Sequence, residues 1–211
     1  MSASFSYAVH LPAAGFTRVP WKNGEGISSE IAIFPPGTSL KGGDFLWRLS
    51  AAEINQPGDF SAFPGFERVL ALVAGRELVL RTADQMVALS QGEVFRFSGQ
   101  DAFRSELTHG PVKDFGVIFR ASAVKVEMKV LDFQKRARSF TLPSATNFFF
   151  VVAGEFSAEA YPGELTFPLG PGDALRVNPL EGERIVLLQP NAKQGRIVAV
   201  EIVDLGEAIS N

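Results

Sequence analysis

Hydrophobic and polar residues alternate with a period of two along much of the chain. The pattern is clearest in five stretches bounded by Gly, Pro, Asp or Asn: residues 46–54, 68–81, 93–99, 114–120 and 124–131. Such alternation between turn-forming residues is typical of β-strands with one buried face. No stretch of similar length has the 3.6-residue period of an amphipathic helix. The pattern therefore predicts an all-β protein.

The strand pattern occurs twice in the chain. The segment "ERVLALVAGRELVL" matches "NFFFVVAGEFSAEA", and "ALSQGEVFRFSG" matches "FPLGPGDALRVNP". The spacing is nearly constant, since Gly75 and Gly154 are 79 residues apart and Gly92 and Gly172 are 80 apart. Two copies of one β unit predict two stacked or fused barrels. We expect an N-terminal barrel over 1–122 and a C-terminal barrel over 123–211, and leave exchange of strands between them open.

The amino-acid composition of the chain argues against several classes of function. A hydrophobic content of 46% over 211 residues is ample for a folded core. The net charge is only -3, with acidic and basic residues interspersed, which argues against nucleic-acid and anionic-membrane partners. The absence of cysteine excludes disulfides, thiolate ligands and a cysteine nucleophile. Without a membrane-length apolar run or a basic, then apolar N-terminus, we expect a cytoplasmic protein.

The motifs of the chain also resemble known proteins. An apolar strand ending in Ala-Gly, followed by a second strand and a Gly-Glu/Asp turn, resembles the cupin jelly roll. Four motifs then follow in order: "RVPWKNGEGISSEI", "FLWRLSAAEI", "GDFSAFPGFERVLALVAG" and "GPVKDFGVIFR". Together they resemble the HutD/Ves family of bacterial bicupins, which implies two jelly-roll β-barrels in one chain, the second degenerate. One departure is Glu25, which interrupts the glycines that usually follow Trp-Lys-Asn-Gly in this family.

The cupin resemblance allows a test for metal ligands. Metal-binding cupins carry two histidines and a glutamate on adjacent strands, completed by a further histidine. In this chain Arg68 stands at the position of the glutamate. Ser61 and Phe63 stand near the positions of the first two histidines, and Phe103 stands near the position of the last one. The whole chain has only two histidines. This residue set does not suit a divalent transition metal, so we expect neither a metal nor another cofactor.

An arginine at the glutamate position suggests a different chemistry. A guanidinium directed into a phenylalanine-lined barrel needs an anion, because an unpaired buried charge is very costly. Arg48 and Ser50 lie two residues apart and so share one face of a strand. If that face is interior, these residues and Arg68 form a cationic patch suited to a small carboxylate. The alternative is that the arginines face solvent or pair with a nearby acid, and Asp114 is a candidate either for that pairing or for the site.

The stretch from Trp21 to Gly26 precedes the first strong strand and should form a connection at the mouth of the first barrel. Gly24 and Gly26 permit positive φ or close backbone approach. Trp21 can stack on a ligand, and Lys22 and Asn23 can offer donors. The alternative is a tight turn with the indole anchored on the core.

The leading hypothesis is a metal-independent protein that binds a small carboxylate. The resemblance to HutD implies a role beside bacterial histidine degradation, such as sensing or buffering an intermediate like formylglutamate. One alternative is a metal-free isomerase or hydrolase with His109 or Glu30 as base, and another is a protein-interaction module. Exposed sheet edges and 19 phenylalanines are compatible with a homodimer. Catalytic residues are not assigned, and the ligand-binding candidates are Trp21, Lys22, Asn23, Arg48, Ser50, Ser61, Phe63, Arg68 and Asp114.

Overall fold

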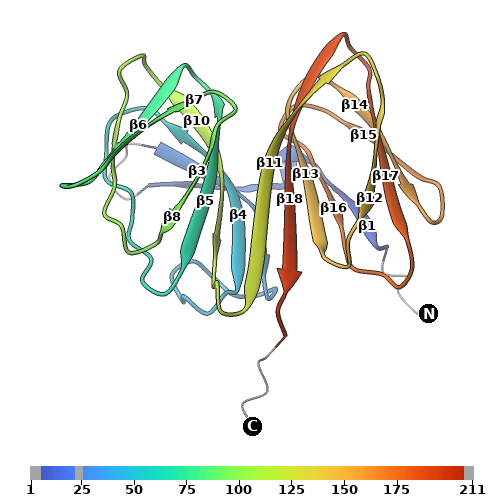
Figure 1. Ribbon diagram of the computed structural model, residues 1–211, viewed down its shortest axis with the longest axis horizontal. Coiled ribbons are helices and arrows are strands. Elements are labelled where there is room, and N and C mark those ends of the chain that lie inside the picture. Colours follow the sequence, from blue (N-terminus) through green and yellow to red (C-terminus); the bar gives the residue numbers. More distant parts are fainter. Residues whose placement is uncertain (1–5, 22–25, 207–211) are drawn as a thin grey trace. The chain divides into compact units, whose positions relative to one another are not determined.

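The computed structural model describes residues 6–21 and 26–206 as an all-β structure (Figure 1). Within these ranges the only helical element is a short 3-10 turn at Ala13–Gly15. The described ranges hold no helix with the length and apolar character needed to cross a membrane. The all-β fold predicted from the alternation is confirmed.

The described chain divides into two compact units. The N-terminal unit comprises residues 16–21, 26–128 and 205–206, and the C-terminal unit comprises residues 6–15 and 129–204. Strand β11 (Val124–Gln134) begins in the N-terminal unit and continues into the C-terminal unit. The domains expected from sequence, 1–122 and 123–211, stay a prediction.

The N-terminal unit contains two antiparallel sheets. The larger has six strands in the order β2 (Thr17–Pro20), β3 (Gly26–Phe34), β4 (Trp47–Ile54), β10 (Val112–Phe119), β5 (Glu67–Ala74) and β8 (Val94–Ser98). The smaller has the order β7 (Met86–Ser90), β6 (Glu77–Arg81) and β9 (Arg104–Glu106). An apolar cluster contributed by both sheets includes Ile54, Leu70, Leu72, Leu78, Leu80 and Leu89. The core of this unit therefore lies between its two sheets.

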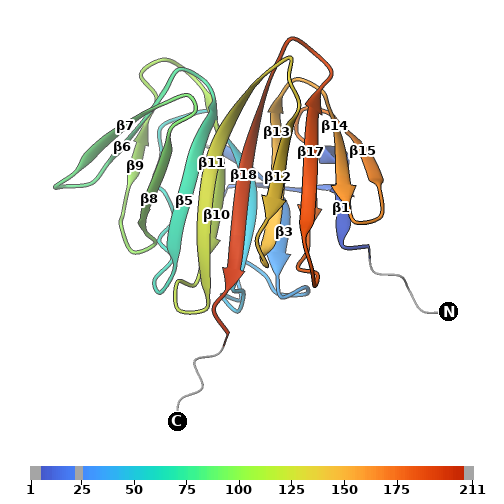
Figure 2. The same cartoon turned by 45° about the vertical axis from the view of Figure 1, so that its right-hand side comes forward.

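The C-terminal unit also contains two sheets. One has the order β1 (Ala8–Leu11), β16 (Ala174–Val177), β13 (Thr146–Ala153), β18 (Gln194–Asp204) and β11. The other, visible in Figure 2, has the order β12 (Arg138–Leu142), β17 (Arg184–Pro190), β14 (Phe156–Tyr161) and β15 (Leu165–Leu169). Buried apolar side chains from both sheets form its core, among them Phe149, Val151, Phe156, Leu175, Val186 and Leu188.

The internal repeat marks equivalent turns in the two units. Strand β5 is followed directly by Gly75, with φ 95°, and strand β13 is followed directly by Gly154, with φ 83°. Glycine is required at Gly75 because an added Cβ would lie 2.7 Å from Cγ1 of Val112. The described sheets have a linear strand order with two edges each, so they are not closed barrels. The arrangement as two jelly-roll barrels stays a prediction.

Candidate ligand-binding site

One face of the six-stranded sheet carries three rows of side chains, because register partners on neighbouring strands point to the same face. The first row consists of Val19, Ser28, Ala52 and Asp114. The second row consists of Thr17, Glu30, Ser50, Gly116 and Leu70. The third row consists of Arg48, Ile118 and Arg68. All of these residues line one cavity.

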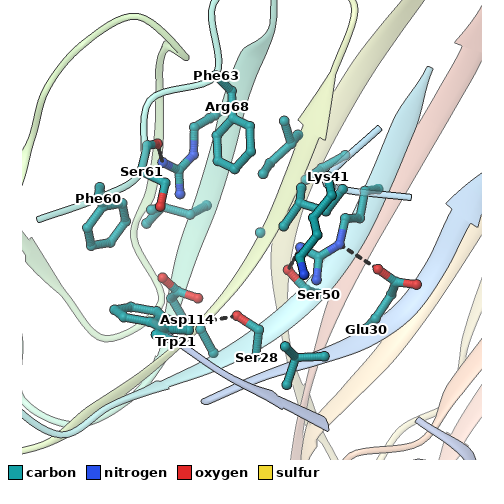
Figure 3. Close-up of a pocket in the computed structure, with 18 of the residues that line it drawn as sticks. Trp21, Ser28, Glu30, Lys41, Ser50, Phe60, Ser61, Phe63, Arg68 and Asp114 are labelled. Atoms are coloured by element: carbon teal, nitrogen blue, oxygen red, sulfur yellow. Dashed lines mark hydrogen bonds and ion pairs between the residues drawn. The ribbon is translucent and has the colours of Figure 1, made fainter. Parts of the chain in front are cut away.

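This cavity has a volume of about 570 Å³ and lies entirely within the N-terminal unit. Figure 3 shows its charged and aromatic side chains directed toward a shared space. Trp21 and two connecting segments complete the wall, and the segments contribute Thr38, Ser39, Leu40, Lys41, Asp59, Phe60, Ser61 and Phe63. A largely apolar wall with a few convergent polar groups is typical of small-molecule sites.

Arg68 provides a cation that lies among aromatic rings. Its Cζ atom lies 4.9 Å, 5.6 Å and 5.0 Å from the ring centroids of Phe60, Phe63 and Phe97. Its Nη1 donates a hydrogen bond of 3.1 Å to the carbonyl oxygen of Ser61. Burial lowers the pKa of Arg68 to about 10, against an opposing effect of Asp114, so the guanidinium is charged at neutral pH.

Arg48 already has an anionic partner. Its Nε donates a hydrogen bond of 2.7 Å to Oε2 of Glu30, and its Nη1 donates one of 3.0 Å to Oγ of Ser50. The Arg48 side chain is only 6% exposed, whereas that of Glu30 is 30% exposed. The ion pair neutralises Arg48, so this arginine offers less unbalanced charge to a ligand than Arg68 does.

Asp114 places a carboxyl group in the same cavity. The residue is 7% exposed, and among the described residues its carboxyl accepts a hydrogen bond from the backbone of Ala52. Burial raises the pKa of Asp114 to about 6, while Arg68 and this hydrogen bond partly offset the effect. Near neutral pH a small change of environment can therefore change the charge of Asp114.

Trp21 forms part of the cavity wall (Figure 3). Its Nε1 donates a hydrogen bond of 2.9 Å to Oγ of Ser28, and its ring meets Phe60 edge to face at 6.3 Å between centroids. The backbone N–H of Trp21 donates to the carbonyl of Gly26, which fixes the residue at the end of its hairpin. The indole is thus held by both its polar and its apolar parts.

Seven of the nine predicted ligand-binding residues line the cavity: Trp21, Arg48, Ser50, Ser61, Phe63, Arg68 and Asp114. Lys22 and Asn23 lie outside the described residues. The structure thus brings the seven together, and their binding of a ligand stays a prediction. Sequence reasoning missed Ser28, which the alternation around Glu30 could have suggested. It also missed Lys41, which lies in a connection without periodicity and so gave no signal.

The positions that hold metal in other cupins do not fit a metal here. Ser61, Phe63 and Arg68 line the cavity with a hydroxyl, a phenyl ring and a guanidinium, none of which is a good ligand for a divalent cation. Among the described residues, no group of three or more His, Asp or Glu side chains is arranged to hold a metal ion. We therefore derive no chemistry through a metal.

His109, considered above as a general base, is not among the residues that line the cavity. Its Nδ1 lies 3.0 Å from Oγ1 of Thr108 and 3.5 Å from Oε1 of Glu77. Its side chain is 39% exposed. Of the two bases considered, only Glu30 faces the cavity, and that carboxylate is engaged by Arg48.

Comparison with solved structures shows that the chain has a cupin-like, all-β fold. Hazelnut vicilin, a cupin-like protein from Corylus avellana, matches with a TM-score of 0.66 and 12% identity, covering 95% of this chain and 86% of its own. At this identity the likeness shows the fold alone. A conserved protein of unknown function from Pseudomonas aeruginosa PAO1 is more similar, with a TM-score of 0.84 and 27% identity, covering 93% of this chain and 99% of that one.

The chain belongs to the HutD family, whose model matches residues 13–196. HutD from Pseudomonas fluorescens SBW25, solved in a formate condition, matches with a TM-score of 0.78 and 29% identity over 94% of this chain and 100% of that one. Protein Ves of Escherichia fergusonii is 36% identical over 137 residues, 64% of this chain and 67% of that protein. An uncharacterized 21.2 kDa protein from the hutC 3' region of Pseudomonas putida is 31% identical over 195 residues, 92% of this chain and 96% of that one. The resemblance to HutD and Ves found in the motifs is confirmed.

Proposed function

We propose that this protein binds a small carboxylate in the cavity of its N-terminal unit without the help of a metal. In this role it senses or buffers an intermediate of bacterial histidine degradation, such as formylglutamate. The two units then act as two jelly-roll barrels, of which only the N-terminal one carries a site. The packed apolar core of the C-terminal unit supports a scaffolding role for that unit.

The environment of Arg68 carries the proposal. Its contacts among the described residues are one carbonyl oxygen and three phenyl rings. A carbonyl offers only part of the charge that a guanidinium requires, and the half-buried Arg68 lies among phenyl rings, where an anion that balances its charge is favoured. A carboxylate accepts two parallel hydrogen bonds from a guanidinium, which makes it a suitable occupant. Ser50 and Lys41 supply further donors in the same cavity.

The names of two relatives suggest which carboxylates to test first. The protein from Pseudomonas putida is named for its place in the hutC 3' region. The HutD structure from Pseudomonas fluorescens was obtained in a formate condition, and formate is the smallest carboxylate. These are properties of the relatives, and for this chain they favour histidine-derived carboxylates as the first compounds to test.

The test is a thermal-shift screen of the wild-type protein and an Arg68→Met variant against formate, glutarate, urocanate and N-formyl-L-glutamate. Methionine keeps much of the volume of arginine and removes its charge. A ligand at 100 times its dissociation constant stabilises the native state by about 2.7 kcal/mol, which such a scan detects. The matched control is Arg81→Met, because Arg81 pairs with Glu106 on the smaller sheet and does not line the cavity.

We expect at least one carboxylate to stabilise the wild type and Arg81→Met but not Arg68→Met. No stabilisation of the wild type by any of the four would contradict the proposal, as would an equal shift in all three proteins. Turnover of a stabilising compound, followed by NMR, would instead favour the metal-free enzyme.

A further inference from the structure

The cavity that holds Arg68 also holds a carboxyl group, that of Asp114, which interacts with the charge of Arg68 but forms no direct ion pair among the described residues. Asp114 lies on β10 and Arg68 on β5, and both side chains face the same space. Asp114 is four residues from Ile118, the register partner of Arg68, which corresponds to about 13 Å along the strand. Gly116 lies between Asp114 and Ile118 on β10 and has no side chain, which leaves room for a ligand above this strand of the cavity wall.

The other charged groups of the cavity do not neutralise Asp114. Glu30 is paired with Arg48 at 2.7 Å, and Asp59 is paired with Arg104 at 2.9 Å. The neighbouring Lys113 bonds to Glu53 at 3.1 Å and does not line the cavity. The charged groups that face Asp114 across the cavity from other elements are Arg68 from β5, Arg48 from β4, Glu30 from β3, and Lys41 and Asp59 from the connecting segments.

An anion bound at Arg68 therefore shares a largely apolar cavity with a second carboxyl group. Two negative charges in such a space repel each other strongly, unless one of them takes up a proton. The ligand carboxylate is held by the guanidinium, whereas Asp114 has a backbone N–H as its described donor. The group that takes up the proton is thus Asp114.

We propose that the site takes up a proton on Asp114 when it binds its carboxylate ligand, so that Asp114 sets the pH range in which the ligand is held. This inference rests on the proposed function. The raised pKa of Asp114, about 6 in the free protein, agrees with it. A bound anion cancels the effect by which Arg68 lowers this pKa, so the pKa rises further in the complex. At pH values between the pKa of Asp114 in the free protein and its pKa in the complex, ligand binding is accompanied by uptake of a proton.

The experiment is an isothermal titration of the full chain with N-formyl-L-glutamate between pH about 5.5 and about 8, in two buffers of different ionisation enthalpy. For a linkage of one proton, the dissociation constant should change little below pH about 6 and should rise toward roughly tenfold per pH unit above it. The difference in heat between the two buffers should correspond to uptake of up to one proton per ligand.

The variant Asp114→Asn keeps the size of the side chain and fixes it in an uncharged form. We expect it to bind the probe at pH about 8 as tightly as the wild type does near pH 5.5, without proton uptake. A gain of affinity cannot result from misfolding. The control Glu30→Gln removes another cavity carboxylate and should change the affinity while keeping the proton uptake.

Each outcome of these titrations either supports or overturns the linkage between ligand binding and protonation of Asp114. Binding by the wild type with no proton uptake, or the same pH profile in Asp114→Asn, would overturn the linkage and leave the proposed function intact. Binding of N-formyl-L-glutamate by neither protein at any pH would overturn the linkage for this ligand, and absence of binding of formate, glutarate and urocanate as well would overturn the proposed function. Binding at pH about 8 by Asp114→Asn alone would support the linkage in its strongest form.

Discussion

Replacing Asp114 by asparagine should stabilise the free protein, and more so as the pH rises. Burial raises the pKa of Asp114 from 3.8 in the unfolded chain to about 6 in the folded protein. The folded state therefore binds the carboxyl proton of Asp114 more tightly than the unfolded state does. The stabilisation that this proton gives is complete below pH about 4 and is lost as the pH rises through about 6. A shift of about two pKa units at 1.36 kcal/mol each makes ionised Asp114 cost about 3 kcal/mol above pH 7. Asparagine does not titrate and avoids this cost.

Urea unfolding of the two proteins at pH about 5 and about 7.5 measures the effect, because roughly half of the cost is already present at the lower pH. The stability advantage of Asp114→Asn should grow by about 1.4 kcal/mol between these pH values. The neutral control Ser50→Ala should show the same stability difference from wild type at both. An advantage of Asp114→Asn that does not change with pH would refute the reasoning, since the carboxyl would then titrate alike in the folded and unfolded chains.

Three further changes test the architecture of the site. Arg48→Met leaves Glu30 without its cation and should lower stability by about 1–3 kcal/mol in thermal unfolding. The double variant Arg48→Met, Glu30→Gln should recover part of this loss, and no recovery would contradict the pairing of the two residues. Gly75→Ala places a Cβ at φ 95° and 2.7 Å from a neighbouring side chain, so it should cost about 1–3 kcal/mol in urea unfolding, and wild-type stability would refute this. N-formyl-L-glutamate should change the tryptophan fluorescence of the wild type and of Trp47→Phe but not that of Trp21→Phe, because Trp21 lines the cavity and Trp47 does not. A fluorescence change that persists in Trp21→Phe and vanishes in Trp47→Phe would place the ligand elsewhere.

Much of the fold was predictable because it depends on local pattern. Alternation identified the strands β4, β5, β6, β8, β10 and β11, and the glycines of the repeat mark equivalent turns at Gly75 and Gly154. The site was predictable where spacing alone fixes the side of a strand, as for Arg48 and Ser50, which point to one face. The gathering of Arg48, Arg68 and Asp114 around one cavity then follows from the register of β4, β10 and β5.

The rest depends on contacts that no local pattern contains. Lys41 reaches the cavity from a connection whose path is set by the strands on either side. The pairing of Arg48 with Glu30, rather than with Asp114, depends on the register of β3 against β4. The raised pKa of Asp114 results from its burial in the folded chain. These features determine which arginine is left for a ligand, and only the folded structure identifies it as Arg68.

The most direct test of the central claim is an isothermal titration with N-formyl-L-glutamate at pH about 6, with a metal chelator present, where Asp114 is half protonated. Wild type should be compared with Gly116→Leu, in which the added side chain enters the cavity between Asp114 and Arg68. A Cβ at Gly116 would make only ordinary contacts, at 3.5 Å and 3.7 Å, so the strand should tolerate the change. We predict one binding site in the wild type and none in Gly116→Leu. Absence of binding in the wild type, or equal binding by a folded Gly116→Leu, would contradict the assignment of this cavity as the carboxylate site.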